Sequence, residues 1–254
     1  MDAAAVWWCL EQVGLLPHEI IDVALESGCR GMELAPEEHW PELRDRGLAI
    51  VSHRGHDSIE VGLNRPDQHP RIHEELGASI ELAKDWSVPV LVCFSGSRGE
   101  ESDLEGIWAT VDGLRPLVPV AEAAGVTLAI ELLNSRVDHP LYQCDRAAWG
   151  STVVDMICSP NVKMLYDVYH AQIMEGDVIR TVTRDASRIG HYHVAGNPGR
   201  NEPDERQELY YPAIYRAIAE TGYNGWIGLE YVPQDAPLAS MKAAVRQLHE
   251  SLGA

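Results

Sequence analysis

Short apolar runs alternate along the whole chain with segments in which apolar residues recur at helical spacing. Short apolar runs bounded by turn residues are typical of strands buried in a parallel sheet. We expect such strands at residues 3–9, 30–34, 48–52, 89–94, 126–132, 161–167, 189–195 and 226–230.

The segments between these strands show apolar residues three and four positions apart, which predicts helices. We expect one helix around Leu43 and others at residues 17–28, 72–86, 107–121, 153–157, 179–182, 211–222 and 237–252. Proline near a helix start and glycine at its end support several of these boundaries, as at Pro17 and Gly28.

Regular alternation of strands and helices is typical of a parallel sheet, either closed into a barrel or open and doubly wound. The first strand is not followed by a Gly-x-Gly-x-x-Gly motif, so the dinucleotide-binding open sheet lacks its phosphate-binding turn. We therefore expect an α/β fold, a single (β/α)8 TIM barrel spanning residues 1–254, a length usual for that fold.

Composition narrows the class of protein. The chain has 20 Lys and Arg against 39 Asp and Glu, a formal net charge of -19, which repels polyanions and argues against a nucleic-acid partner. Its five cysteines are scattered without a Cys-x-x-Cys pair, as in reduced compartments. No apolar run approaches a membrane span, and the N-terminus does not resemble a signal peptide. We expect a cytoplasmic protein that does not associate with membranes.

Polar residues that could bind a metal end four consecutive predicted strands: Glu131, Asp167, His193 and Glu230. In a barrel the carboxyl ends of all strands open on one face, so we expect these four side chains to converge. Three carboxylates in apolar surroundings require a positive partner. Together with an imidazole they suit one divalent ion, Mn²⁺, Mg²⁺, Co²⁺ or Zn²⁺. His193 has the weakest support, because His191 lies on the same strand face.

Several segments carry a family resemblance from about Thr127 to Val232. They are residues 129–138, 163–170 with 174–177, 190–193 with 197–200, and 222–223 with 228–230. In order and spacing they resemble the hydroxypyruvate isomerase family, which belongs to the xylose isomerase-like TIM barrels. The resemblance implies a metal held by Glu131, Asp167, His193 and Glu230, and a substrate pocket lined by His170 and Arg200.

Other residues follow strands on the face where we expect the site. Glu33 ends the second strand, and His53 and His56 follow the third, so all three could contact substrate, although an ion pair among them is an equal alternative. Arg200 lies in a loop rich in Gly and Pro and could bind a substrate carboxylate through paired hydrogen bonds. Its alternative is a solvated loop cation.

Together with the resemblance, these groups predict a metal-dependent isomerase that acts through an enediolate. A divalent ion chelated by a carbonyl and the adjacent hydroxyl acidifies the C–H between them, and Glu131 and Glu230 are the candidates for general base and acid. One glutamate that moves the proton between neighbouring carbons gives isomerisation, and two glutamates on opposite faces give epimerisation. The expected substrate is a small 2-oxo acid or sugar, most simply hydroxypyruvate converted to tartronate semialdehyde.

Three alternatives remain open. His193 stands where many hydroxypyruvate isomerases look to have glutamine and related sugar epimerases have histidine, so a ketose 3-epimerase or another sugar isomerase is the nearest one. An endonuclease acting on abasic DNA needs a basic face that the net charge opposes. A catalytically idle metal- or sugar-binding barrel is the non-enzymatic alternative. We also expect the chain to self-associate into a homo-oligomer.

Overall fold

The strands of the protein form a parallel barrel. The computed structural model describes residues 1–253, and in them the sheet closes in sequence order from the first strand to the eighth, which confirms the predicted TIM barrel. The strands are β1 (Asp2–Val6), β2 (Gly31–Glu33), β3 (Ala49–Arg54), β4 (Val90–Cys93), β5 (Thr127–Glu131), β6 (Val162–Asp167), β7 (Ile189–Val194) and β8 (Trp226–Leu229). Most of their residues are buried, as strands covered by helices require.

Helices follow or separate these strands. They are α1 (Trp7–Gln12), α2 (Pro17–Ser27), α3 (Trp40–Asp45), α4 (His69–Trp86), α5 (Asp103–Leu114), α6 (Val118–Ala124), α7 (Ala147–Ile157), α8 (Val168–Met174), α9 (Val178–Arg184), α10 (Tyr211–Glu220) and α11 (Pro237–Leu252). Three short 3-10 turns join them: η1 (Glu37–His39), η2 (Pro66–Gln68) and η3 (Arg115–Leu117). Among the described residues no helix is long and apolar enough to cross a bilayer.

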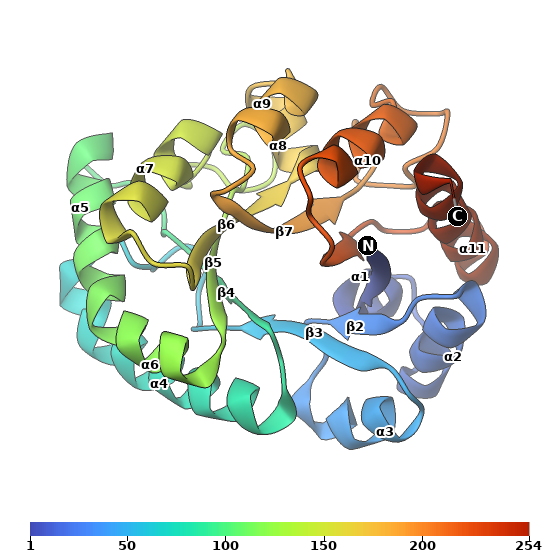
Figure 1. The fold of residues 1–254 in the computed structure, drawn as a ribbon, viewed down its shortest axis with the longest axis horizontal. Coiled ribbons are helices and arrows are strands. Elements are labelled where there is room, and N and C mark those ends of the chain that lie inside the picture. Colours follow the sequence, from blue (N-terminus) through green and yellow to red (C-terminus); the bar gives the residue numbers. More distant parts are fainter. Residues whose placement is uncertain (254) are drawn as a thin grey trace. The chain divides into compact units, whose positions relative to one another are not determined.

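The chain divides into two compact units, and the prediction of one domain over residues 1–254 stays a prediction. The first unit contains residues 1–51, 177–186 and those from 192 onward. In it β1 pairs with β2 on one side and with β8 on the other, and β8 pairs with β7. Helix α11 packs between α2 and α10, on the outer side of these strands (Figure 1).

The second unit contains residues 52–176 and 187–191. Its central strands β4, β5 and β6 pair in parallel. Figure 1 shows α4, α5, α6 and α7 along their outer side, where α5 contacts α7 and α4 contacts α6. Both units thus consist of inner strands covered by outer helices.

The first predicted strand was too long at its C-terminal end. We expected a strand over residues 3–9, but β1 ends at Val6 and α1 begins at Trp7. Trp7, Cys9 and Leu10 are buried in this helix. A continuous apolar run is equally compatible with a buried strand and a buried helical turn, so periodicity alone did not show the change.

The helix predicted over residues 107–121 is divided in the structure. Helix α5 ends at Leu114, η3 holds Pro116, and α6 has Pro119 in its first turn. Proline lacks the backbone N–H that a helix interior needs but fits the first turn, which explains both breaks. No helix was predicted directly after Asp167, where helix α8 follows β6.

The hydroxyl of Tyr142 connects the loop after β5 to the end of β5 and to the segment that follows β4. It donates to the Glu131 backbone oxygen at 3.1 Å and accepts the Ser95 N–H at 2.9 Å, and the side chain is fully buried. We expect Tyr142→Phe to lower the free energy of unfolding by about 1–3 kcal/mol, because both backbone groups lose a buried partner. Urea denaturation measures this. Tyr210→Phe, at a side chain that is 68% exposed, is the control and should change little; equal effects of the two variants would contradict the assignment.

Candidate functional site

A cluster of five side chains lies at the strand ends of the first unit, and we call it the His193 cluster: Trp8, Glu33, His193, Arg200 and Glu230. The His193 ring lies between two carboxylates, with Nδ1 2.9 Å from Glu230 Oε2 and Nε2 3.0 Å from Glu33 Oε2. Glu33 and His193 have no exposed surface, and Glu230 is only 4% exposed. The ring is therefore held from both sides inside the protein.

Two further groups of this cluster contact Glu230. The indole Nε1 of Trp8 donates to its Oε1 at 3.0 Å, and the guanidinium of Arg200 donates to its Oε2 at 2.6 Å. Arg200 also stacks on the Trp8 ring, with Cζ 5.1 Å from the ring centroid. Both oxygens of Glu230 thus accept hydrogen bonds, which fix the direction of this buried carboxylate.

The fold supplies these positions from four elements. Glu33 ends β2, Trp8 is in the first turn of α1, and His193 on β7 pairs with Gly228 on β8. Glu230 follows β8, and its N–H donates to the Val194 oxygen at 3.1 Å. Hydrogen-bonded strands therefore place the His193 and Glu230 side chains, so little of their arrangement depends on loop conformation.

Arg200 is the exception, because it lies in a loop. Its backbone oxygen accepts the Val232 N–H at 2.8 Å, and its φ of 56° is in the left-handed region that is strained for residues other than glycine. Asn201 next to it donates its side-chain N–H to the Val232 oxygen at 2.9 Å. The loop after β7 is in this way bonded to the loop after β8, beside Glu230.

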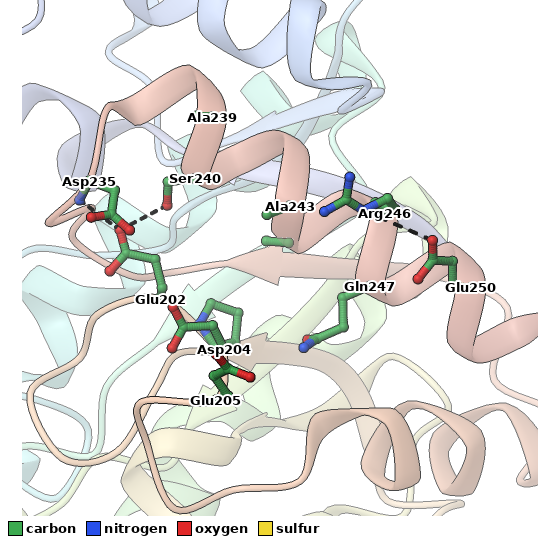
Figure 2. A pocket seen from close by; sticks show the side chains of 12 residues that line it. Glu202, Asp204, Glu205, Asp235, Ala239, Ser240, Ala243, Arg246, Gln247 and Glu250 are labelled. Carbon is green, nitrogen blue, oxygen red and sulfur yellow. Dashed lines mark hydrogen bonds and ion pairs between the residues drawn. The ribbon is translucent and has the colours of Figure 1, made fainter.

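Glu202 continues this connection between the two loops. Its Oε1 accepts the N–H groups of Gln234 and Asp235 and the Ser240 hydroxyl, at 2.9, 3.0 and 3.0 Å. Figure 2 shows the contacts with Asp235 and Ser240. A cavity of about 470 Å³ opens beside α11 at this point. Acidic side chains and small residues of α11 make up most of its walls, Arg246 and Gln247 also line it, and no member of the His193 cluster does. Glu202 thus anchors the loop that carries Arg200.

The second unit has its own cluster, the Asp167 cluster: Glu131, Asn134, Asp167 and His170. Glu131 ends β5 and Asp167 ends β6, and each can offer a carboxylate oxygen within 4.8 Å of the other. Asp167 Oδ1 caps helix α8 by accepting the N–H groups of Tyr169 and His170 at 2.7 and 3.3 Å. The cap fixes the direction of the carboxylate at a favourable helix N-terminus.

Hydrogen bonding defines the tautomer of His170. Its Nδ1 accepts the Asn134 backbone N–H at 3.1 Å and lies 2.6 Å from the Asn134 side-chain nitrogen. Asp138 in turn accepts from that side-chain nitrogen at 2.6 Å. Since Nδ1 accepts, the proton of the neutral ring is on Nε2, which lies 3.6 Å from Asp167 Oδ2.

Seven of the predicted site residues lie in these two clusters. The structure brings Glu33, His193, Arg200 and Glu230 into one cluster, and Glu131, Asp167 and His170 into the other. His53 lies half-buried in β3. Two contributors were not assigned a site role from the sequence, Trp8 and Asn134. A polar residue shortly after a buried strand was the available signal for Asn134.

His56 has a well-defined structural role. Its Nε2 accepts the Phe94 N–H at 3.0 Å, and Nδ1 lies 3.1 Å from the Asp57 oxygen, so this nitrogen donates. The side chain is 2% exposed, and burial lowers the pKa of the ring from its ordinary 6.5. Both ring nitrogens bond to backbone groups, and the sequence-based assignment of His56 to substrate binding stays a prediction.

The ligand atoms present suit a divalent metal ion. The described residues include groups of buried His and acidic side chains that could hold one. His193 Nδ1 and Glu230 Oε2 are 2.9 Å apart. Two ligand atoms at right angles, each about 2.1 Å from one ion, are about 3.0 Å apart, so this pair fits adjacent positions of one coordination sphere. One imidazole with carboxylates also matches the ligands that such ions prefer.

Comparison with known proteins gives a consistent result. The model of the family described as xylose isomerase-like TIM barrel matches residues 21–251. A 2-oxo-tetronate isomerase of Cupriavidus necator is 42% identical over 239 residues, covering 88% of this chain and 91% of the relative. The hydroxypyruvate isomerase of Escherichia coli is 31% identical over 178 residues, covering 70% and 68%.

Two solved structures show the same fold at lower identity. An AP endonuclease of family 2 from Brucella melitensis has a TM-score of 0.84 at 24% identity, covering 95% of this chain and 97% of that one. The IolI protein, solved with a zinc atom, has a TM-score of 0.73 at 16% identity, covering 99% and 96%.

The His56 contacts predict how stability depends on pH. Because the folded ring stays neutral while the unfolded ring binds a proton near pH 6.5, the free energy of unfolding should fall as the pH drops below 6.5 toward the lowered folded pKa. Comparing urea denaturation at pH 7.5 and 5.5 tests this. In His56→Gln part of that fall should be missing, whereas His18→Gln, at an exposed position, should retain it. Identical pH profiles for the two variants would refute the assignment.

Proposed function

Since the chain belongs to the hydroxypyruvate isomerase family of xylose isomerase-like TIM barrels, we propose that it is a divalent-metal-dependent isomerase of small 3-hydroxy-2-oxo acids. Hydroxypyruvate, which would give tartronate semialdehyde, and 2-oxo-tetronate are the two substrates that its relatives suggest. Both carry a carboxylate, a 2-oxo group and a 3-hydroxyl, so one reaction describes them.

The metal ligands in this proposal are Glu131, Asp167, His193 and Glu230, with Mn²⁺, Mg²⁺, Co²⁺ or Zn²⁺ as the ion. The 2.9 Å separation of His193 Nδ1 and Glu230 Oε2 supports it. When bound, such an ion would withdraw electron density from the carbonyl and hydroxyl oxygens of the substrate and so acidify the C–H between them. The other steps belong to the side chains of the protein.

The observation that carries the choice of substrate is the position of Arg200. Its guanidinium bonds to Glu230, one of the proposed ligands, and is braced by the Trp8 ring. A planar guanidinium binds carboxylates through two parallel hydrogen bonds, and a neutral ketose offers no such partner. Arg200 therefore favours an oxo acid, whose carboxylate it would hold beside the reacting carbons.

The two glutamates have different roles in the proposal. Glu230 accepts hydrogen bonds on both oxygens, including one from Arg200, which favours its ionised form and suits a ligand better than a proton carrier. This leaves Glu131 as the general base. One base that removes a proton from C3 and returns it to C2 gives isomerisation, whereas epimerisation would need a second carrier on the opposite face.

In the proposed reaction one proton moves between carbons and one between oxygens. Glu131 takes the C3 proton, and the electron pair of that bond forms the C2–C3 double bond of an enediolate. The hydroxyl proton moves from the C3 oxygen to the C2 oxygen, and Glu131 then protonates C2, which leaves a 2-hydroxy-3-oxo acid. His170, with its proton on Nε2, could donate a hydrogen bond to a substrate oxygen during this transfer.

Solvent exchange tests this function directly. In deuterated water the protein reconstituted with Mn²⁺ should incorporate deuterium into hydroxypyruvate or 2-oxo-tetronate, measured by NMR, and the metal-free protein should not. Glu131→Gln should bind Mn²⁺ but lose at least about 100-fold in exchange rate, the size expected for removal of a general base. Deuterium incorporation only into ketoses would favour the 3-epimerase. A protein that binds metal but incorporates deuterium into no substrate would favour the catalytically idle barrel.

The role of Arg200 can be tested separately. Arg200→Gln should raise the KM for the oxo acid at least about tenfold, because a charge-assisted bond to the substrate carboxylate is lost. The matched control is Arg216→Gln on the exposed side of α10, which should leave steady-state kinetics unchanged. An unaltered KM in the Arg200 variant would rule out the carboxylate contact.

A further inference from the structure

Glu33 bonds to the side of the His193 ring that faces away from Glu230. The proposed function uses Nδ1 of this ring, which lies beside Glu230, and the opposite nitrogen Nε2 is 3.0 Å from Glu33 Oε2. A neutral imidazole has one proton, so a ring that gives Nδ1 to a metal carries its proton on Nε2. The Glu33 carboxylate is in position to accept that proton's hydrogen bond.

The surroundings of Glu33 are built for this contact. Its side chain has no exposed surface, which is unfavourable for a carboxylate unless partners compensate for the lost hydration. The close approach of the Glu33 carboxylate to the His193 ring also depends on Gly228, which pairs with His193 from the neighbouring strand. A Cβ at Gly228 would lie 2.5 Å from both Glu33 Oε1 and His193 Cδ2. Only glycine at this position leaves room for the carboxylate and the ring together.

From this geometry we propose that Glu33 is a positioning residue that fixes the tautomer and orientation of His193, with Gly228 providing the space, so that Nδ1 is presented to the metal. The inference rests on the proposed function and deepens it. It differs from the role expected from the sequence, in which Glu33 touches substrate. Carboxylates behind histidine ligands raise ligand basicity and typically contribute roughly 10–100-fold to metal affinity.

Wild-type protein loaded with Zn²⁺ provides the first test. A two-bond ¹H–¹⁵N correlation spectrum of the histidine rings distinguishes protonated from unprotonated nitrogens, and the His193 signals are those missing in His193→Gln. We expect Nε2 protonated and Nδ1 metal-bound. A protonated Nδ1, or Zn²⁺ bound through Nε2, would overturn the proposal, and this result does not depend on any Glu33 variant being folded.

Metal affinity provides the second test, by calorimetric titration with Mn²⁺. Glu33→Ala should raise the Kd roughly 10–100-fold, and Glu33→Gln by less, because an amide oxygen can still accept from Nε2. Gly228→Ala should also raise the Kd for Mn²⁺. Glu38→Ala removes an equal charge from the exposed turn after β2, and it should bind as the wild type does. Unchanged affinity in folded Glu33→Ala would overturn the proposal.

Kinetics with saturating Mn²⁺ separate positioning from substrate contact. If Glu33 acts through His193, the variant with restored metal should keep its KM for the oxo acid. A raised KM with normal Mn²⁺ affinity would identify a substrate ligand instead and reject the inference. Wild-type protein that binds Mn²⁺ but exchanges no substrate proton would remove the proposed function while leaving the role of Glu33 intact, so the two failures are distinguishable.

Discussion

The cost of burying charge is the constraint on which the functional part of this protein depends. Glu33, Asp167 and Glu230 are at most 4% exposed, in a place where an isolated carboxylate would be strongly disfavoured. The cost of burial is offset differently for each carboxylate. Glu230 accepts hydrogen bonds from an indole and a guanidinium, and Asp167 accepts them from backbone N–H groups at the N-terminus of α8. Glu33 contacts the His193 ring. The barrel can hold so much negative charge only because these donors are built around it.

These hydrogen-bond partners also restrict the movement of the side chains in the site. A metal site requires ligands that keep their direction before the ion arrives, and hydrogen bonds from neighbouring groups provide this more precisely than packing alone. In the first unit the direction of the His193 ring is set by Glu33 on one side and Glu230 on the other. In the second unit Asn134 performs the equivalent task for His170. Residues behind the proposed ligands therefore matter as much as the ligands.

Arg200 shows how a side chain on a loop can be held as precisely as a side chain on a strand. Its backbone is in the left-handed region. The loop is bonded to the segment after β8 by the contact of Arg200 with Val232 and, two residues further along both segments, by the contact of Glu202 with Gln234. Backbone strain of this kind persists only where surrounding contacts over-determine the conformation, and it is concentrated at functional sites. The tethered loop keeps the guanidinium beside Glu230, where a substrate carboxylate would have to compete with that glutamate for it.

The sequence by itself determined the barrel, the order of its strands and the strand-end positions of Glu131, Asp167, His193 and Glu230. These features depend on local patterns: an apolar run of the length of a strand, interrupted by a polar residue at its carboxyl end, repeated with helical segments between. The sequence did not predict three boundaries: the start of α1 at Trp7, the break at Pro116 and the start of α8 after Asp167. At these points the same apolar run or helical spacing is compatible with two kinds of structure.

Only the tertiary structure decided what each polar side chain does. Glu33, for which the sequence suggested substrate contact or an ion pair with His53 or His56, contacts the His193 ring, and His56 bonds to backbone on both nitrogens. In each case one partner is far away in the chain, 160 residues between Glu33 and His193 and 38 between His56 and Phe94. Hydrogen bonds depend on distances and directions within a few tenths of an ångström, and these arise only when strands from distant segments are brought into register.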